Sequence, residues 1–100
     1  MRFFVYILEC SDGTYYTGNT SNLILRLSQH HAGYDTTSYT YNRRPVKLIW
    51  AQEFPSRYEA LSFERQIKGW SHKKKQALIE DDIMKIHQIV KQERQRKENK

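Results

Sequence analysis

The chain has 100 residues, which is enough for one small domain and too few for a second with its own core. Its 17 lysines and arginines outnumber 11 aspartates and glutamates, and the net charge of +6 predicts an anionic partner, most commonly nucleic acid. The single cysteine, Cys10, excludes an intrachain disulfide and a cysteine-based zinc cluster and fits a reducing cytoplasm. Because no segment approaches the roughly 20 apolar residues that span a bilayer, we expect no membrane contact.

The residue pattern predicts an α/β domain of the α+β type. Strand-forming runs alternate with helical periodicity, and turn residues such as Ser11-Asp12-Gly13, Gly33 and Pro55-Ser56 separate them. The order is strand, strand, helix, strand, helix, helix, helix, with strands over 3–10, 14–19 and 46–54 and helices over 21–32, 57–69, 71–79 and 83–93. Thr20 or Ser21 is expected to cap the first helix. A small three-stranded, mostly antiparallel sheet flanked by helices follows from this order.

The turn between the first two strands leaves the hairpin register open. A two-residue loop would place Tyr6 and Tyr16 on opposite faces of the hairpin. A three-residue loop with Gly13 in the left-handed conformation would place both tyrosines on one face, with Gly18 opposite Tyr6. The sequence permits either register.

Both longer helices carry polar residues on the side that should face the sheet. In the first helix, Arg26 and His30 share a stripe with Leu23 and Leu27, and an arginine rarely occupies a buried face without an anion to meet. In the next helix, Glu64 lies on the apolar stripe, where a carboxylate must be paired, metal-bound or protonated. A surface ion pair between this glutamate and Lys68, four residues on, is the alternative interpretation.

Together these residue types fit one reaction, the hydrolysis of a phosphodiester bond. A tyrosine such as Tyr6 or Tyr16 can act as a general base when a cation lowers its pKa. Arg26 can stabilise charge that develops on a phosphate, and Glu64 can hold one Mg²⁺ whose other ligands are water and substrate.

Four segments in this order resemble the motifs of the GIY-YIG endonuclease superfamily, in particular its small stand-alone bacterial members. Val5-Tyr6-Ile7 and Tyr16-Thr17-Gly18 are similar to the two halves of the signature, Arg26 with His30 to the helix motif, and Glu59–Lys68 to the glutamate segment. The resemblance implies that Tyr6 and Tyr16 activate or position water, that Arg26 and His30 act on the phosphate, and that Glu64 binds one Mg²⁺ or Mn²⁺ ion.

The resemblance also implies the domain limits and the partner. Residues 1–82 would form the nuclease-type domain, and 83–100 a basic helix with a frayed tail, in which six basic residues stand against two acidic ones. The expected partner is nucleic acid, with DNA favoured over RNA. Substrate contacts are predicted at four further positions: Gly18, Tyr39, Arg43 and Arg44.

Two other functions stay open at this stage. A nucleic-acid-binding module could keep the fold without turnover, and a protein-interaction module could use the apolar stripe of 83–93. The polar loop 34–44, with its tyrosines and arginines, could stack on bases or simply pack on the sheet. The Lys73-Lys74-Lys75 run is interpreted as a solvated helix face in preference to a phosphate track.

Overall fold

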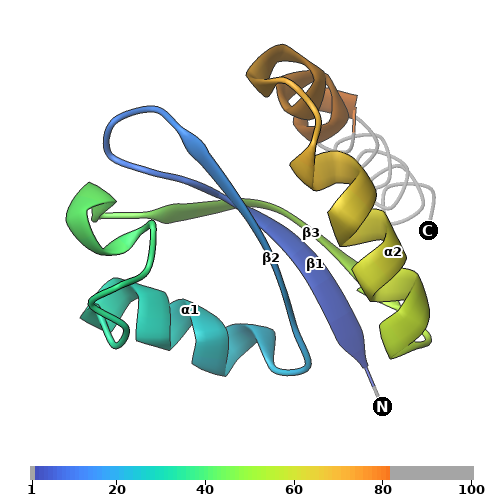
Figure 1. The fold of residues 1–100 in the computed structure, drawn as a ribbon, viewed down its shortest axis with the longest axis horizontal. Helices are drawn as coiled ribbons and strands as arrows, with labels where there is room; N and C mark the ends of the chain where they lie inside the picture. The colour runs from blue at the N-terminus through green and yellow to red at the C-terminus, as the bar shows by residue number, and fades with distance from the viewer. Residues whose placement is uncertain (1, 82–100) are drawn as a thin grey trace, which may run out of the picture.

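A computed structural model of the chain describes residues 2–81 and confirms the predicted α+β fold. The elements in chain order are β1 (Phe3–Glu9), β2 (Tyr15–Thr20), α1 (Leu23–Ala32), a short 3-10 turn (Tyr41–Arg43), β3 (Lys47–Phe54) and α2 (Arg57–Lys68), followed by a helical segment over 72–81. The strands form one antiparallel sheet in the order β2-β1-β3. Figure 1 shows α1 on one side of this sheet and α2 with the 72–81 segment on the other.

The central strand β1 supplies both layers of the core because its side chains alternate between the two faces. Val5 and Ile7 point to the α2 side and pack with Trp50 and Ile67. On the α1 side, Tyr6 and Leu8 pack with Cys10 and Val46, and partly buried Leu23 and Leu27 complete the layer. Each fully buried aliphatic side chain contributes about 1.5–3 kcal/mol to the free energy of unfolding, so this thin core needs every one of them.

The hairpin adopts the register with the three-residue loop. Gly13 has a φ of 82°, in the left-handed region, and the Cys10 amide donates to the Thr14 carbonyl at 2.8 Å. Tyr6 consequently pairs with Gly18, and Leu8 pairs with Tyr16. Both tyrosines therefore project from the face that α1 covers.

The helix ends match the sequence except at one cap. Gly33 ends α1 in the left-handed conformation, with a φ of 68°, and the Ser56 hydroxyl caps α2 by accepting from the Glu59 amide at 3.2 Å. The predicted α1 cap at Thr20 or Ser21 is wrong, because Thr20 is still paired in β2. Asn22 takes the cap position, and its Oδ1 accepts from the Leu25 amide at 3.0 Å.

The 72–81 segment departs from the sequence expectation at two points. It stays helical through Glu80 and Asp81, where the acidic run predicted a break. Lys75 is buried, although the lysine run was expected to be solvated, because Ile79 on the same helix face packs into the core. The predicted final helix and tail lie outside the described residues. Within residues 2–81, no helix combines the length and apolar character needed to cross a bilayer.

Candidate active site

A chain of three hydrogen-bonded side chains lies between the sheet and α1. The Tyr6 hydroxyl and His30 Nε2 are 2.9 Å apart, and His30 Nδ1 lies 3.0 Å from Thr40 Oγ1. Tyr6 is fully buried, and Thr40 is nearly so. Strand β1, helix α1 and the 34–44 loop thus each contribute one member, which fixes the imidazole at both of its nitrogens.

Gly18 makes the position of Tyr6 possible. A Cβ atom at Gly18 would lie 2.5 Å from the Tyr6 hydroxyl oxygen and 2.6 Å from its Cζ. The phenol therefore lies across the backbone of β2, the edge strand of the sheet. Tyr16 stands beside it, with ring centroids 6.3 Å apart, and His30 meets both rings edge-on. The predicted role of Gly18 in substrate contact stays a prediction, while its packing role is evident.

Burial, and not a nearby cation, has the largest effect on the pKa of Tyr6. Burial raises the pKa of Tyr6 above its ordinary value, and the neighbouring Tyr16 acts in the same direction. The Arg26 guanidinium lowers that pKa through its charge and a hydrogen bond, without overcoming burial. The expectation of a tyrosine with a lowered pKa is thus wrong for this residue, because the side chain is more deeply buried than the strand pattern indicated.

The direction of the Tyr6–His30 and His30–Thr40 hydrogen bonds depends on the tautomer of His30. Burial is the main cause that lowers the pKa of His30, and Arg26 adds to it, so the imidazole is neutral near pH 7. In the tautomer of His30 that carries its proton on Nδ1, the Tyr6 hydroxyl donates to Nε2. His30 Nδ1 then donates to Thr40. In this tautomer the lone pair of His30 Nε2 accepts from the phenol, so a neutral proton acceptor lies beside the Tyr6 hydroxyl.

Arg26 occupies the rim of this arrangement. Its stripe on α1 predicted a buried arginine, but the residue is exposed while His30, one turn later, is buried. His30, in the last turn, is the buried residue of α1. An exposed guanidinium whose charge also acts on the buried phenol can bind a phosphate from solvent.

Glu64 approaches from the other side of the sheet. It belongs to α2 and is buried, as its stripe predicted. One carboxylate oxygen accepts from the Asn19 side-chain amide at the end of β2, and the other lies 3.1 Å from Lys68 Nζ. The inward position and the surface ion pair are therefore both present. The negative charge of Glu64 is the smallest of the causes that raise the pKa of Tyr6.

The surroundings of Glu64 fit one divalent ion and do not fit a cluster. No group of three or more histidine, cysteine, aspartate or glutamate side chains suited to a metal occurs within residues 2–81. A single carboxylate suits Mg²⁺, which keeps several waters and takes few protein ligands. The Lys68 ammonium already occupies a cation position at this carboxylate, with 58% of its side chain exposed, so a small ion could replace it without moving the backbone.

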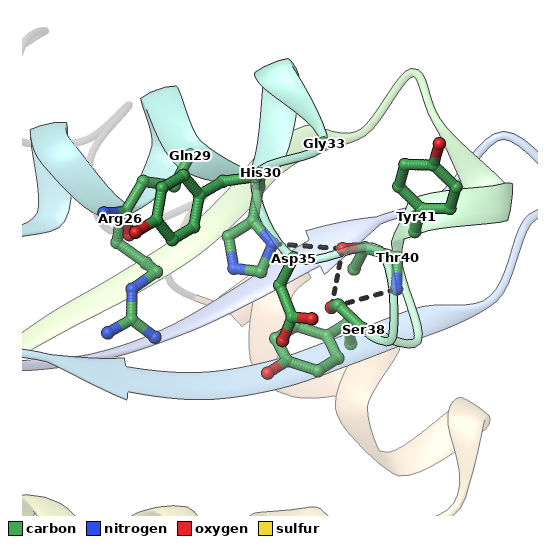
Figure 2. Close-up of a pocket in the computed structure, with 10 residues that line it drawn as sticks. Arg26, Gln29, His30, Gly33, Asp35, Ser38, Thr40 and Tyr41 are labelled. Carbon is green, nitrogen blue, oxygen red and sulfur yellow. Dashed lines mark hydrogen bonds between the residues drawn. The ribbon is translucent and has the colours of Figure 1, made fainter.

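A cavity of about 370 Å³ opens beside the buried histidine, between α1 and the 34–44 loop. Three predicted site residues line it: Tyr16, Arg26 and His30. Figure 2 shows Arg26, His30 and Asp35 around it, with the bonds that join His30, Thr40 and Ser38. Tyr6 and Glu64 do not line this cavity. The predicted site is therefore divided between a cavity on the α1 side and a carboxylate across the edge strand.

The predicted substrate contacts in the loop are engaged with their own chain. The Arg43 guanidinium lies 3.9 Å from the Tyr39 ring centroid and pairs with Asp12 at 3.0 Å. Arg44 lies over the Tyr41 ring and donates to the Tyr41 carbonyl at 3.0 Å. These contacts brace the loop against the hairpin and α1. A role in substrate binding stays a prediction for Tyr39, Arg43 and Arg44.

Sequence reasoning missed the residues that position the predicted ones. Thr40 and Ser38 hold His30 through a bond that spans ten positions, and Asn19 holds Glu64 through one that spans 45. No helical or strand period links such pairs. The sequence contains one indirect indication of these residues. It predicts His30 and Glu64 on inward faces, and a buried polar group needs a hydrogen-bond partner.

Comparison with known proteins bears on this arrangement. Residues 2–77 match the family model described as the GIY-YIG catalytic domain. A UPF0213 protein of Halobacterium salinarum is 47% identical over 75 residues, which cover 75% of this chain and 96% of that protein. A UPF0213 protein of Syntrophus aciditrophicus is 46% identical over 79% of this chain and 91% of its own length.

Solved structures show the same fold. The solution structure of a UPF0213 protein from Bacillus halodurans superposes with a TM-score of 0.54 at 40% identity, covering 80% of this chain and 84% of that one. A second solution structure, of a protein from E. faecalis, gives 0.60 at 31% identity, covering 84% and 88%. Since the family model matches residues 2–77, a span that includes the four motif segments, the chain belongs to the GIY-YIG family, with small UPF0213 proteins as its relatives.

Proposed function

We propose that this protein hydrolyses phosphodiester bonds in nucleic acid with the help of one divalent metal ion. The observation that carries the proposal is the Tyr6–His30 pair, in which a buried phenol lies 2.9 Å from a neutral imidazole and the Arg26 charge acts to lower the pKa of the phenol. Membership of a family of nucleases supports the reaction class. The direct test is cleavage of end-labelled DNA and RNA in Mg²⁺ and its loss in EDTA.

In this proposal the attacking water gives its proton to the Tyr6–His30 pair once the phenol, which is fully buried in this structure, becomes accessible to it. A phenol with a raised pKa is a poor base by itself, but it can accept a proton while it passes its own to His30. Thr40 holds the imidazole in the orientation that leaves Nε2 free to accept. Arg26 binds the phosphate and stabilises the charge that its oxygens gain in the transition state.

Glu64 is the residue that would hold the metal, with Asn19 fixing the carboxylate. A divalent ion bound there supplies positive charge to the phosphate and makes water more acidic. Lys68 must leave the Glu64 oxygen that it now contacts at 3.1 Å. We therefore expect the Lys68 ammonium to compete with the metal for Glu64.

Removing the charge of Lys68 should therefore tighten metal binding. We expect Lys68→Met to bind Mn²⁺ roughly two- to fivefold more tightly, because an exposed ion pair is worth at most about 1 kcal/mol. Mn²⁺ titration followed by electron paramagnetic resonance measures this without any turnover. Lys47→Met, an exposed lysine on β3, is the matched control and should leave the affinity unchanged. Equal affinities for both variants would show that Lys68 does not occupy the metal position.

The proton pathway predicts that kcat/KM decreases at acidic pH only below the ordinary pKa of a histidine. His30 must be neutral to accept a proton, and burial lowers its pKa below the ordinary 6.5. The rate constant kcat/KM should thus stay level as the pH falls to about 6.5, and drop about tenfold per pH unit only below the lowered pKa. His30→Gln should remove this limb. A midpoint at or above 6.5 in the wild type would exclude His30 as the acceptor.

A further inference from the structure

The cavity between α1 and the 34–44 loop has features that the proposed hydrolysis does not use. Its lining has opposite charges at two places, the Arg26 guanidinium and the Asp35 carboxylate. In the view of Figure 2, the two side chains extend the same way, with the His30 ring between them. Its volume of about 370 Å³ lies at the small end of ligand-binding pockets, which is suitable for one nucleotide unit.

The Asp35 carboxylate is held so that one oxygen stays available. Its Oδ1 accepts from the Thr37 amide at 2.9 Å and from the Thr37 hydroxyl at 2.6 Å. Within residues 2–81, Oδ2 has no hydrogen-bond partner, and no cation pairs with this carboxylate. A fixed carboxylate repels phosphate and accepts hydrogen bonds, so this end of the cavity favours a group that carries amino N–H donors.

Tyr34 supplies a free aromatic surface at the same cavity. Its side chain is 77% exposed, and among the described residues its ring contacts no other ring or cation. By contrast, Tyr39 is covered by Tyr16 and Arg43, and Tyr41 by Arg44. One exposed tyrosine beside a cavity is what a nucleobase needs for stacking.

We propose that this cavity binds one unpaired nucleobase next to the phosphate held by Arg26, and that Asp35 favours bases with an amino group. Adenine, cytosine and guanine present exocyclic amino groups, whereas the single N3–H donor of thymine and uracil lies between two carbonyl oxygens that the carboxylate repels. The base stacks on Tyr34. Gln29 also lines the cavity and would make a further polar contact with the base. The inference rests on the proposed function for the phosphate position only.

Binding in EDTA tests the pocket separately from cleavage. Fluorescence anisotropy with 12-nucleotide single strands of dC, dA or dT gives the affinities of the full chain. We expect the wild type to bind the dC and dA strands several-fold more tightly than dT, and Asp35→Asn to abolish most of that preference. Tyr34→Ala should weaken binding to all three about fivefold or more. Tyr58→Ala, whose side chain is 80% exposed on α2, is the matched control and should change nothing.

The outcomes separate this pocket from the nuclease proposal. Equal affinity for the three strands, an unchanged preference in Asp35→Asn, or equal effects of Tyr34→Ala and Tyr58→Ala would each overturn the pocket. Absence of binding to any strand would overturn it too. Cleavage without these preferences leaves the nuclease proposal standing alone. The predicted preferences in EDTA, without cleavage of any substrate in Mg²⁺, support the pocket and remove the nuclease.

Discussion

Replacing Glu64 by glutamine is expected to remove cleavage and to leave nucleic-acid binding intact or tighter. The substitution keeps the shape of the side chain and its hydrogen bond to Asn19 but removes the charge that would hold the metal. It also removes a negative charge from the neighbourhood of the substrate phosphate, which favours binding. Cleavage assays in Mg²⁺ and anisotropy titrations in EDTA measure the two effects independently.

The matched control for this variant is Glu53→Gln on β3. Glu53 is exposed and pairs with Arg2, so its loss should affect neither cleavage nor the fold. Glu64→Gln should also fold normally. Burying a charge costs free energy, and the neutral amide of glutamine can form hydrogen bonds in place of the carboxylate. Wild-type rates for Glu64→Gln would mean that any observed activity comes from a contaminant or from another site.

Arg26→Ala is expected to slow turnover by about 10²–10³-fold, which is the usual effect of losing one preorganised donor in the transition state. Ground-state binding should weaken far less, because many phosphate contacts share that free energy. Single-turnover rates at saturating enzyme give the chemical step, and anisotropy in EDTA gives the affinity. The loss should therefore lie in the rate constant and not in the affinity.

Arg57→Ala is a suitable comparison for the arginine variant. Arg57 is exposed at the start of α2 and belongs to none of the site contacts described above. Both variants lose one positive charge, so a purely electrostatic contribution to binding would lower the two affinities equally. If Arg57→Ala slowed turnover as much as Arg26→Ala, Arg26 would have no special position at the phosphate.

The fold was predictable where local chemistry fixes it. The left-handed residue Gly13 allowed the three-residue turn, and that turn determines which face carries both tyrosines. Capping was less certain at α1, where three consecutive residues can all cap a helix. Asn22 is the cap because Thr20 pairs with β1 as part of β2. Such pairing depends on a partner strand, which the local sequence does not describe.

The site was predictable as a set of residues but not as a geometry. Periodicity indicated that Glu64 points inward, but not that α2 lies on the sheet face opposite α1. The depth of Tyr6 also escaped prediction, because it depends on Gly18 and α1 together, and this depth reverses the expected direction of its pKa shift. Contacts between the 34–44 loop and His30 are non-local, so no sequence period reveals them.

The most direct test of the proposed activity is a cleavage assay of the purified chain on end-labelled nucleic acids. The panel contains single strands, duplexes, flaps and branched junctions of DNA and RNA, each incubated with Mg²⁺, Mn²⁺ or EDTA beside Glu64→Gln. We predict cleavage of at least one substrate by the wild type with either metal, and none with EDTA or with Glu64→Gln. Salt-sensitive binding to these substrates without cleavage of any of them would contradict the nuclease assignment and leave a nucleic-acid-binding module.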